Sequence, residues 1–217
     1  MIMKGKKGVI LGIANKKSIA YGIAKACQEQ GAQMAITFLN ERFEHKLAPI
    51  AEDLECGTRL YPCDVSKPEE IKALKVSLEK DMGQIDFIVH SIAFAPKEGL
   101  SGRFMDISKE AFDVAMDVSV YSLIEIVREL KPILSSSSSV LTLSYYGGVK
   151  YIPNIVNVFT WNHIAFPHSS SPSPYCFMFL ATNIPRQDVS TQARIINVAA
   201  ETHGHIITCQ IVNEILV

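Results

Sequence analysis

The sequence predicts an α/β fold in which a doubly wound parallel sheet lies between two layers of helices. Short apolar runs alternate with helical segments through the first 150 residues. This rhythm is typical of parallel strands joined by crossover helices. The chain has 217 residues, of which 48% are hydrophobic, so we expect one domain with a large core.

Five segments are expected to form the strands, because each is a short apolar run bounded by turn residues. They are residues 8–11, 33–38, 58–61, 87–90 and 139–143. Parallel sheets of this kind bind ligands at the carboxyl ends of their strands. The loops that carry function are therefore expected after Leu11, Phe38, Cys63, His90 and Leu143.

The helices are expected to begin near Ser18, Asn40, Ser66 and Ser108. Asn40 and Ser108 are candidate N-caps. Residues 66–69 (SKPE) have the pattern of a capping box with a proline in the first turn. The last helix is predicted to run from Ser108 to Leu134, and its broad apolar stripe indicates core packing, with a subunit interface as the alternative.

The stretch GVILGIANKKSIAYGIAKAC, residues 8–27, indicates where a ligand binds. An apolar strand meets Gly12, a polar loop follows, and Ser18 opens a helix. A helix start presents free N–H groups and the positive end of the helix dipole, which favours a phosphate. The fingerprint G-x-G-x-x-G is absent, so an ordinary strand-to-helix turn with Ser18 as its N-cap is the alternative interpretation.

Composition argues against several classes of function. The formal net charge is -1, which predicts no nucleic-acid partner. The apolar runs fall short of a membrane span or a signal peptide, so we expect a cytoplasmic protein with no membrane attachment. Five scattered cysteines without a C-x-x-C pair predict reduced thiols and no metal site, with Cys27 and Cys63 in the core.

The character of the chain changes after Lys150. The last 67 residues contain no lysine, include the loop-like HSSSPSP at 168–174, and show no long helical pattern. We therefore expect a single domain, residues 1–217, with a Rossmann-type core at residues 1–154. Residues 155–217 are expected to form a divergent tail that is irregular or incomplete.

Several of the expected strand-end loops resemble one family. The stretches are GIANKKSIAYGIA (12–24), CDVS (63–66), DFIVHSIAFAPKEGL (86–100), DVSVYSL (117–123) and LTLSYYGGVKYIPN (141–154). In order and spacing they resemble the bacterial enoyl-acyl carrier protein reductases of type II fatty-acid synthesis. That family is a divergent branch of the short-chain dehydrogenase/reductases, and the resemblance implies a Rossmann-like three-layer fold.

The resemblance also implies a nucleotide site. Gly12 would let the backbone approach the pyrophosphate, and Ser18 would donate its hydroxyl while capping the helix. The other implied cofactor contacts are Ile19, Leu39, Asp64, Val65 and Ile92. The alternatives are a role as helix cap or turn residue for Asp64 and a core role for Ile92. Relatives that prefer NADPH place basic residues where Leu39 and Asn40 stand, so NADH is expected rather than NADPH.

The implied activity is the reduction of a trans-2-enoyl thioester bound to acyl carrier protein. In this family a hydride goes to the β-carbon, and a tyrosine hydroxyl with a nearby lysine stabilises the resulting enolate. Ala95 would line the acyl pocket, and Tyr145 would be a catalytic residue near the substrate carbonyl, with an apolar strand edge as its alternative role. The resemblance further implies a homotetramer.

One part of the family pattern is not matched. The pattern is P-N-Y with a lysine seven residues later, but Ile155 and Asn162 stand at those positions. The tail is either the product of a frameshift or a mis-assigned segment, or a real divergent segment. Two other kinds of function therefore stay open. One is a nucleotide-binding protein without activity, or a scaffold that pairs with an intact subunit. The other is a short-chain dehydrogenase/reductase that acts on a different carbonyl.

Overall fold

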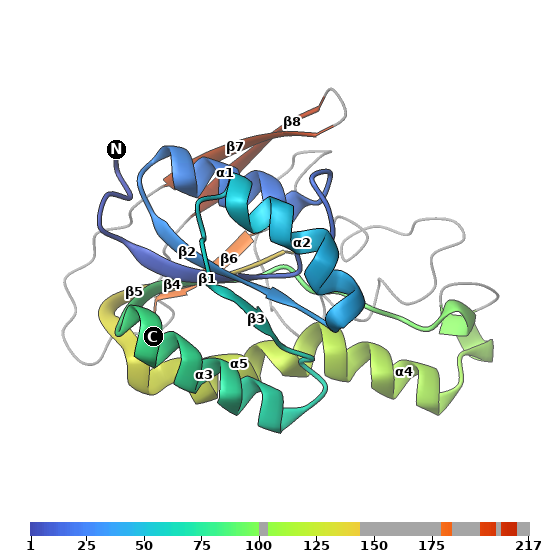
Figure 1. Ribbon diagram of the computed structural model, residues 1–217. Coiled ribbons are helices and arrows are strands. Elements are labelled where there is room, and N and C mark those ends of the chain that lie inside the picture. Colours follow the sequence, from blue (N-terminus) through green and yellow to red (C-terminus); the bar gives the residue numbers. More distant parts are fainter. Residues whose placement is uncertain (100–103, 144–178, 184–195, 203–204, 212–217) are drawn as a thin grey trace.

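A computed structural model of the chain describes residues 1–99, 104–143, 179–183, 196–202 and 205–211 (Figure 1). Its main sheet has six strands in the order β3-β2-β1-β4-β5-β6. The first five strands are parallel: β1 (Lys7–Leu11), β2 (Gln33–Phe38), β3 (Leu60–Pro62), β4 (Ile85–His90) and β5 (Leu134–Leu143). The strand order reverses between β1 and β4, which confirms the doubly wound sheet.

Helices cover both faces of this sheet. On one face lie α1 (Ile19–Glu29) and α2 (Glu41–Asp53), and on the other lie α3 (Pro68–Met82), α4 (Lys109–Met116) and α5 (Ser122–Leu130) (Figure 1). Side chains alternate between the two cores along each strand. In β1, Ile10 packs with the α1 and α2 side, while Val9 and Leu11 pack with the α3 and α5 side. The predicted three layers are confirmed.

The strand predictions hold for position but differ in length. The second strand spans the expected residues, and the third is displaced to Leu60–Pro62. The fifth begins at Leu134, five residues before the expected start at 139, because Leu134 pairs with Ile85 of β4 across a register shift. The serine run between them has no apolar alternation, so only the pairing with β4 reveals it as strand.

The predicted helix starts are correct in place but not always in mechanism. Ser108 caps α4, because its hydroxyl accepts a hydrogen bond from the Ala111 N–H at 3.1 Å. Asn40 and Ser18 occupy N-cap positions, yet neither side chain accepts a hydrogen bond from its helix.

The predicted capping box at residues 66–69 is wrong. Helix α3 begins after Lys67, with Pro68 in its first turn, and Lys67 makes no side-chain cap. The Ser66 hydroxyl instead donates to the Asp64 carboxylate at 2.6 Å. The carboxylate that reaches back belongs to Glu70, which accepts the Asp64 N–H at 2.7 Å. The neighbouring acid therefore competes successfully for the serine.

The long helix predicted from Ser108 to Leu134 is present but divided. A π-helical turn, Asp117–Tyr121, separates α4 from α5, and a short 3₁₀ helix, Lys131–Ile133, ends the run. Ala115, Ile126 and Leu130 of the apolar stripe are fully buried, as core packing requires. On the opposite side Val114, Tyr121 and Ile124 are exposed.

Three more strands are described beyond Leu143. β6 (Phe179–Asn183) pairs with β5 in the antiparallel sense, and β7 (Ile196–Thr202) and β8 (His205–Ile211) form a separate antiparallel pair beside α1 (Figure 1). The alternation of parallel strand and crossover helix thus does not continue into these described segments. That residues 1–217 form a single domain stays a prediction.

Three of the five cysteines lie in the core. Cys27, Cys56 and Cys63 are free thiols with almost no exposed surface, which confirms the core positions predicted for Cys27 and Cys63. Burial raises the pKa of each of those two thiols to about 12. Within the described residues, no helix combines the length and apolar character needed to cross a membrane.

Candidate functional site

The carboxyl ends of β1 to β4 meet at one edge of the sheet, and predicted site residues follow each of them. Leu11 lies beside His90 in the register, and Phe38 lies beside Pro62. Shortly after these strand ends come Gly12, Leu39, Asp64 and Ile92. The fold therefore brings together four turns from distant parts of the chain at the position where doubly wound sheets bind ligands.

Gly12 is required by its neighbour across the sheet. Its φ of +97° lies in the left-handed region, and an added Cβ would lie 1.9 Å from the Ser91 carbonyl oxygen. The Ser91 N–H donates to the Leu11 carbonyl at 3.1 Å, which holds the two turns together. In the structure the backbone at Gly12 therefore packs closely against the turn after β4. That the same backbone also approaches a pyrophosphate stays a prediction.

The turn between β1 and α1 is organised by Asn15. Its side-chain oxygen accepts the Lys17 N–H at 2.7 Å, and its carbonyl accepts the Ser18 hydroxyl at 2.7 Å. The expected Ser18 side-chain cap is absent, because the Ser18 oxygen accepts no hydrogen bond from an N–H group of α1. Ile19 opens α1 and packs partly against the core, while residues 14–17 are exposed.

Asp64 forms a tight turn after β3. Its carboxylate accepts the Ser66 N–H at 3.0 Å in addition to the Ser66 hydroxyl, and the Lys67 ammonium lies 3.5 Å away. Burial alone would raise the pKa of Asp64, but these partners outweigh it and lower that pKa. The next residue, Val65, is buried in the core beneath the turn. The turn role, given above as the alternative for Asp64, is therefore present in the structure.

The turns after β2 and β4 present apolar and uncharged groups. Leu39 is 50% exposed, and Asn40 beside it is exposed. After β4, Ile92 packs partly against the core and Ala95 is half-buried. Between them Phe94 is 52% exposed, although it is a large apolar residue. This edge thus offers apolar surface beside the polar turns of β1 and β3.

The sequence of this region identifies the family. Residues 12–162 match the family model described as Enoyl-(Acyl carrier protein) reductase, and this match covers more than half of the chain. The chain belongs to the enoyl-(acyl carrier protein) reductase family. The resemblance found in the strand-end loops is confirmed.

Relatives in this family are similar to the first part of the chain. The enoyl-[acyl-carrier-protein] reductase [NADH] FabI of Aquifex aeolicus is 47% identical over 155 residues, which are 70% of this chain and 57% of that protein. The corresponding reductase 1 of Rhizobium meliloti is 41% identical over 153 residues, again 70% of this chain and 56% of the relative. The chain therefore spans less than two thirds of the length of these relatives.

Solved structures of family members have the same fold. A reductase of Anaplasma phagocytophilum in complex with NAD gives a TM-score of 0.70 at 44% identity, covering 73% of this chain and 60% of that one. The NADH reductase of Aquifex aeolicus gives a TM-score of 0.71 at 44% identity, covering 74% and 70%. These similarities confirm the Rossmann-like architecture.

Part of the family pattern lies outside the described residues. Tyr145, predicted to lie near the substrate carbonyl, is outside the described residues. So are Ile155 and Asn162, which replace the tyrosine and the lysine of the family pattern. The contacts predicted for Gly12, Ser18, Ile19, Leu39, Asp64, Val65, Ile92 and Ala95 with cofactor or substrate also stay predictions. Within the described ranges, no three His, Cys, Asp or Glu side chains are grouped to bind a metal ion.

Three polar residues near this edge of the reductase fold were not singled out from the sequence. His90 ends β4 and is buried, and its Nε2 lies 2.8 Å from the Ser122 hydroxyl oxygen. Ser119, on the π-helical turn, contacts the backbone of Phe94. His90 lies in the motif HSIAF, and both serines lie in DVSVYSL. Two serines within an otherwise apolar helix were the sequence feature that pointed to a polar contact here.

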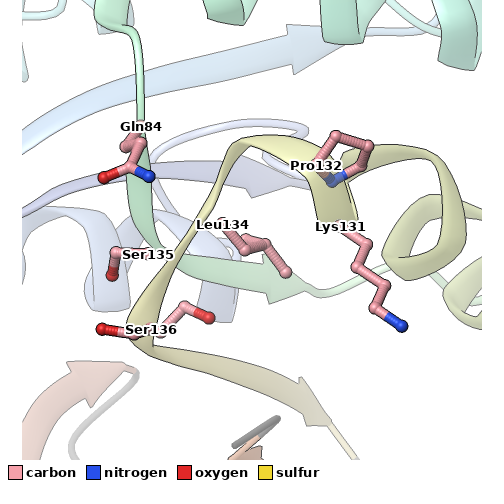
Figure 2. A pocket seen from close by; sticks show the side chains of 7 residues that line it. Gln84, Lys131, Pro132, Leu134, Ser135 and Ser136 are labelled. Atoms are coloured by element: carbon pink, nitrogen blue, oxygen red, sulfur yellow. The ribbon is translucent and has the colours of Figure 1, made fainter. Parts of the chain in front are cut away.

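A hollow of about 530 Å³ lies at the opposite edge of the sheet. Its lining comes from the residue before β4, the 3₁₀ helix and β5: Gln84, Lys131, Pro132, Leu134, Ser135, Ser136 and Ser138. Figure 2 shows and labels the first six of these residues. These are the amino ends of parallel strands, whereas ligands of doubly wound sheets bind at the carboxyl ends. We therefore do not assign the nucleotide to this hollow.

Proposed function

We propose that this chain binds NADH across the carboxyl ends of β1 to β4. The observation that carries the proposal is the convergence of four family motifs on that one edge. The residues at this edge suit NADH. Helix α1 begins behind an exposed polar turn, which suits a pyrophosphate. Leu39 and Asn40 are uncharged, so they offer no cation to the 2′-phosphate of NADPH. Asp64 and Val65 would flank the adenine, and Ile92 the nicotinamide.

The reaction that we propose is the reduction of a trans-2-enoyl thioester carried by acyl carrier protein, as the names of the relatives suggest. NADH, when bound, supplies the hydride. The half-buried Ala95 and the exposed Phe94 would provide apolar surface for the acyl chain. Tyr145 would donate a hydrogen bond toward the thioester oxygen. Three free, buried thiols support a reducing, cytoplasmic setting.

Turnover by this chain is expected to be slow. Ile155 cannot donate a hydrogen bond to a developing enolate, and Asn162 carries no charge to hold a ribose. Losing one preorganised donor at an oxyanion costs about a hundredfold to a thousandfold in rate. With Tyr145 still present, we expect a residual rate and not a complete loss.

The second candidate is a nucleotide-binding protein without activity. It is favoured by the same two residues, Ile155 and Asn162, because the strand-end turns that bind nucleotide do not include them. Such a chain would bind NADH and pair with an intact subunit. A reductase acting on a different carbonyl is the third candidate, and it would turn over ketone substrates but not enoyl thioesters.

The test combines NADH titration by fluorescence with NADH oxidation in the presence of crotonyl thioester. Binding with slow turnover supports the reductase, and binding without turnover supports the inactive protein. The matched comparison replaces the segment after Asn154 with an intact family segment, which includes Ile155→Tyr and Asn162→Lys. We expect this replacement to raise turnover at least a hundredfold. Equal rates in both chains would overturn our assignment of the catalytic groups, and no NADH binding would overturn the proposal as a whole.

We also propose that the chain assembles as a homo-oligomer, a tetramer by resemblance. Val114, Tyr121 and Ile124 lie exposed on the outer side of the α4 to α5 run, where a second copy could cover them. Light scattering coupled to size exclusion tests this. Ile124→Lys is expected to shift the mass toward a monomer, whereas Val76→Lys on the exposed side of α3 leaves it unchanged.

A further inference from the structure

Two serines hold the two ends of the turn after β4. Ser122, at the start of α5, contacts the side chain of His90, where β4 ends. Ser119, three residues earlier on the π-helical turn, contacts the backbone of Phe94. Between His90 and Phe94 lies Ile92, the residue predicted to lie beside the nicotinamide. The contacts join segments 32 and 25 residues apart in the sequence.

Ser119 uses both hydrogen-bonding functions of its hydroxyl on one residue. Its oxygen accepts the Phe94 N–H at 2.9 Å, and its proton is donated to the Phe94 carbonyl at 3.0 Å. The peptide planes on both sides of Phe94 are therefore fixed at once. The Phe94 side chain is 52% exposed, so its burial contributes little to holding this backbone. The two hydrogen bonds carry most of that role.

At the His90 end of the turn, the hydrogen bonds of Ser122 show which group donates each proton. Ser122 donates its hydroxyl proton to the Val118 carbonyl at 2.7 Å, so its oxygen accepts a hydrogen bond from Nε2–H of His90. Burial lowers the pKa of His90 to about 4, which keeps the ring neutral near neutral pH. A neutral His90 therefore links the end of β4 to the start of α5 through one hydrogen bond.

The π-helical turn buries little of its surface, although Val118 packs partly against the core. None of its five residues is fully buried, although helices that cover a sheet normally bury one stripe. Single π-helical turns inside α-helices occur frequently at functional sites. Here the turn carries Ser119, which contacts a loop at the carboxyl edge of the sheet.

We propose that Ser119 is a positioning residue, which fixes the turn after β4 so that Ile92 and Ala95 face the bound nucleotide and acyl chain. The inference rests on the proposed function for the identity of the ligands. The hydrogen bonds to Phe94 do not depend on it. Ser119 acts through the loop backbone and is not assigned a contact with the reacting atoms.

The first experiment measures hydrogen exchange at the Phe94 amide in the full chain. Ser119→Ala removes both hydrogen bonds and is expected to speed this exchange about ten- to thirtyfold. Ser119→Thr keeps a hydroxyl and should restore slow exchange. Ser77→Ala is the matched control, since Ser77 is a partly exposed helical serine whose hydroxyl donates to the Ala73 carbonyl on α3. Unchanged exchange in Ser119→Ala would overturn the proposal.

The second experiment measures NADH affinity by titration of the same variants. We expect Ser119→Ala to weaken binding about three- to tenfold, and Ser119→Thr and Ser77→Ala to bind like the parent chain. Faster exchange with unchanged affinity would overturn the positioning role. A parent chain that binds no NADH would overturn the proposed function, and the exchange rates would then still decide whether Ser119 fixes Phe94.

Discussion

The two edges of the parallel sheet are held by different kinds of polar contact. At the amino edge, the Asp86 carboxylate accepts hydrogen bonds from the Lys6 ammonium at 2.9 Å, the Lys7 N–H at 3.0 Å and the Ser135 hydroxyl at 3.0 Å. One side chain thus ties together β1, β4 and β5. The Lys7 ammonium adds a contact with the Met82 carbonyl at the end of α3.

At the carboxyl edge, the polar side chains mostly bond within their own turns. Ser18 bonds to Asn15 in the turn after β1, and Ser66 bonds to Asp64 in the turn after β3. The turn after β4 differs, because it is tied to the helix by Ser119 and Ser122. The comparison indicates that side chains at the amino edge join neighbouring strands, while most side chains at the carboxyl edge hold individual turns, where we propose that a ligand binds.

The largest effect is expected from Gly12→Ala, which tests whether the carboxyl edge also stabilises the fold. The variant should lose about 2–5 kcal/mol of unfolding free energy, from the left-handed backbone and the clash with Ser91. Gly57→Ala is the control, because Gly57 has a φ of +59° and open space around its Cβ position. Urea denaturation measures both. Equal losses would mean that the contact with Ser91 contributes nothing.

A smaller effect is expected at the amino edge from Asp86→Asn, about 1.5–3 kcal/mol by urea denaturation near neutral pH. The control, Asp113→Asn, removes an exposed pair with Lys109 and should cost less than about 0.5 kcal/mol. Larger losses for Asp113→Asn than for Asp86→Asn would contradict the role given to the amino edge.

The effect of Asp86→Asn should also depend on pH. Burial alone would raise the pKa of Asp86, but hydrogen bonds from Lys6, Lys7 and Ser135 outweigh it and place that pKa below its ordinary value of 3.8. The stabilisation is therefore complete above the unfolded pKa and is lost as the pH falls through the folded pKa. We expect the stability difference between parent and variant to shrink between about pH 5 and pH 2.

An effect on specificity is expected from Leu39→Arg combined with Asn40→Lys. Two cations at the end of β2 should raise the affinity for NADPH relative to NADH about tenfold, because they would face the 2′-phosphate. Titration with both nucleotides measures the ratio. The control places the same two charges on α3, as Val76→Arg with Ser77→Lys. An unchanged ratio would show that the turn after β2 does not reach the ribose.

The smallest effect is expected from Ser66→Ala in the turn after β3. This variant removes one of the two hydrogen bonds from Ser66 to Asp64 and should cost about 0.5–1 kcal/mol. The pKa of Asp64 should rise toward its ordinary value, since the serine hydroxyl stabilises the charged form. An NMR titration of the carboxyl group measures this. A constant pKa would show that the Ser66 hydroxyl does not stabilise the charged form of Asp64.

The sequence by itself determined the layer architecture and the family. Buried parallel strands require apolar runs, and crossovers require helices between them, so residues 8–11 and 33–38 were identifiable without a structure. The strand-end motifs also identified the loops that meet at one edge. Ser108 was recognisable as a cap because a helix start depends on contacts within a few residues.

Only the tertiary structure decided which neighbour each polar group meets. Gly12 is fitted against Ser91, Leu134 becomes a strand residue through Ile85, and Ser119 fixes Phe94. Ser66 looked like a helix cap but bonds to Asp64. Local sequence patterns predict the backbone conformation of a segment. The contacts above join segments that are distant in the chain, or depend on which of two groups wins one hydrogen bond. Both outcomes depend on how the strands and helices pack.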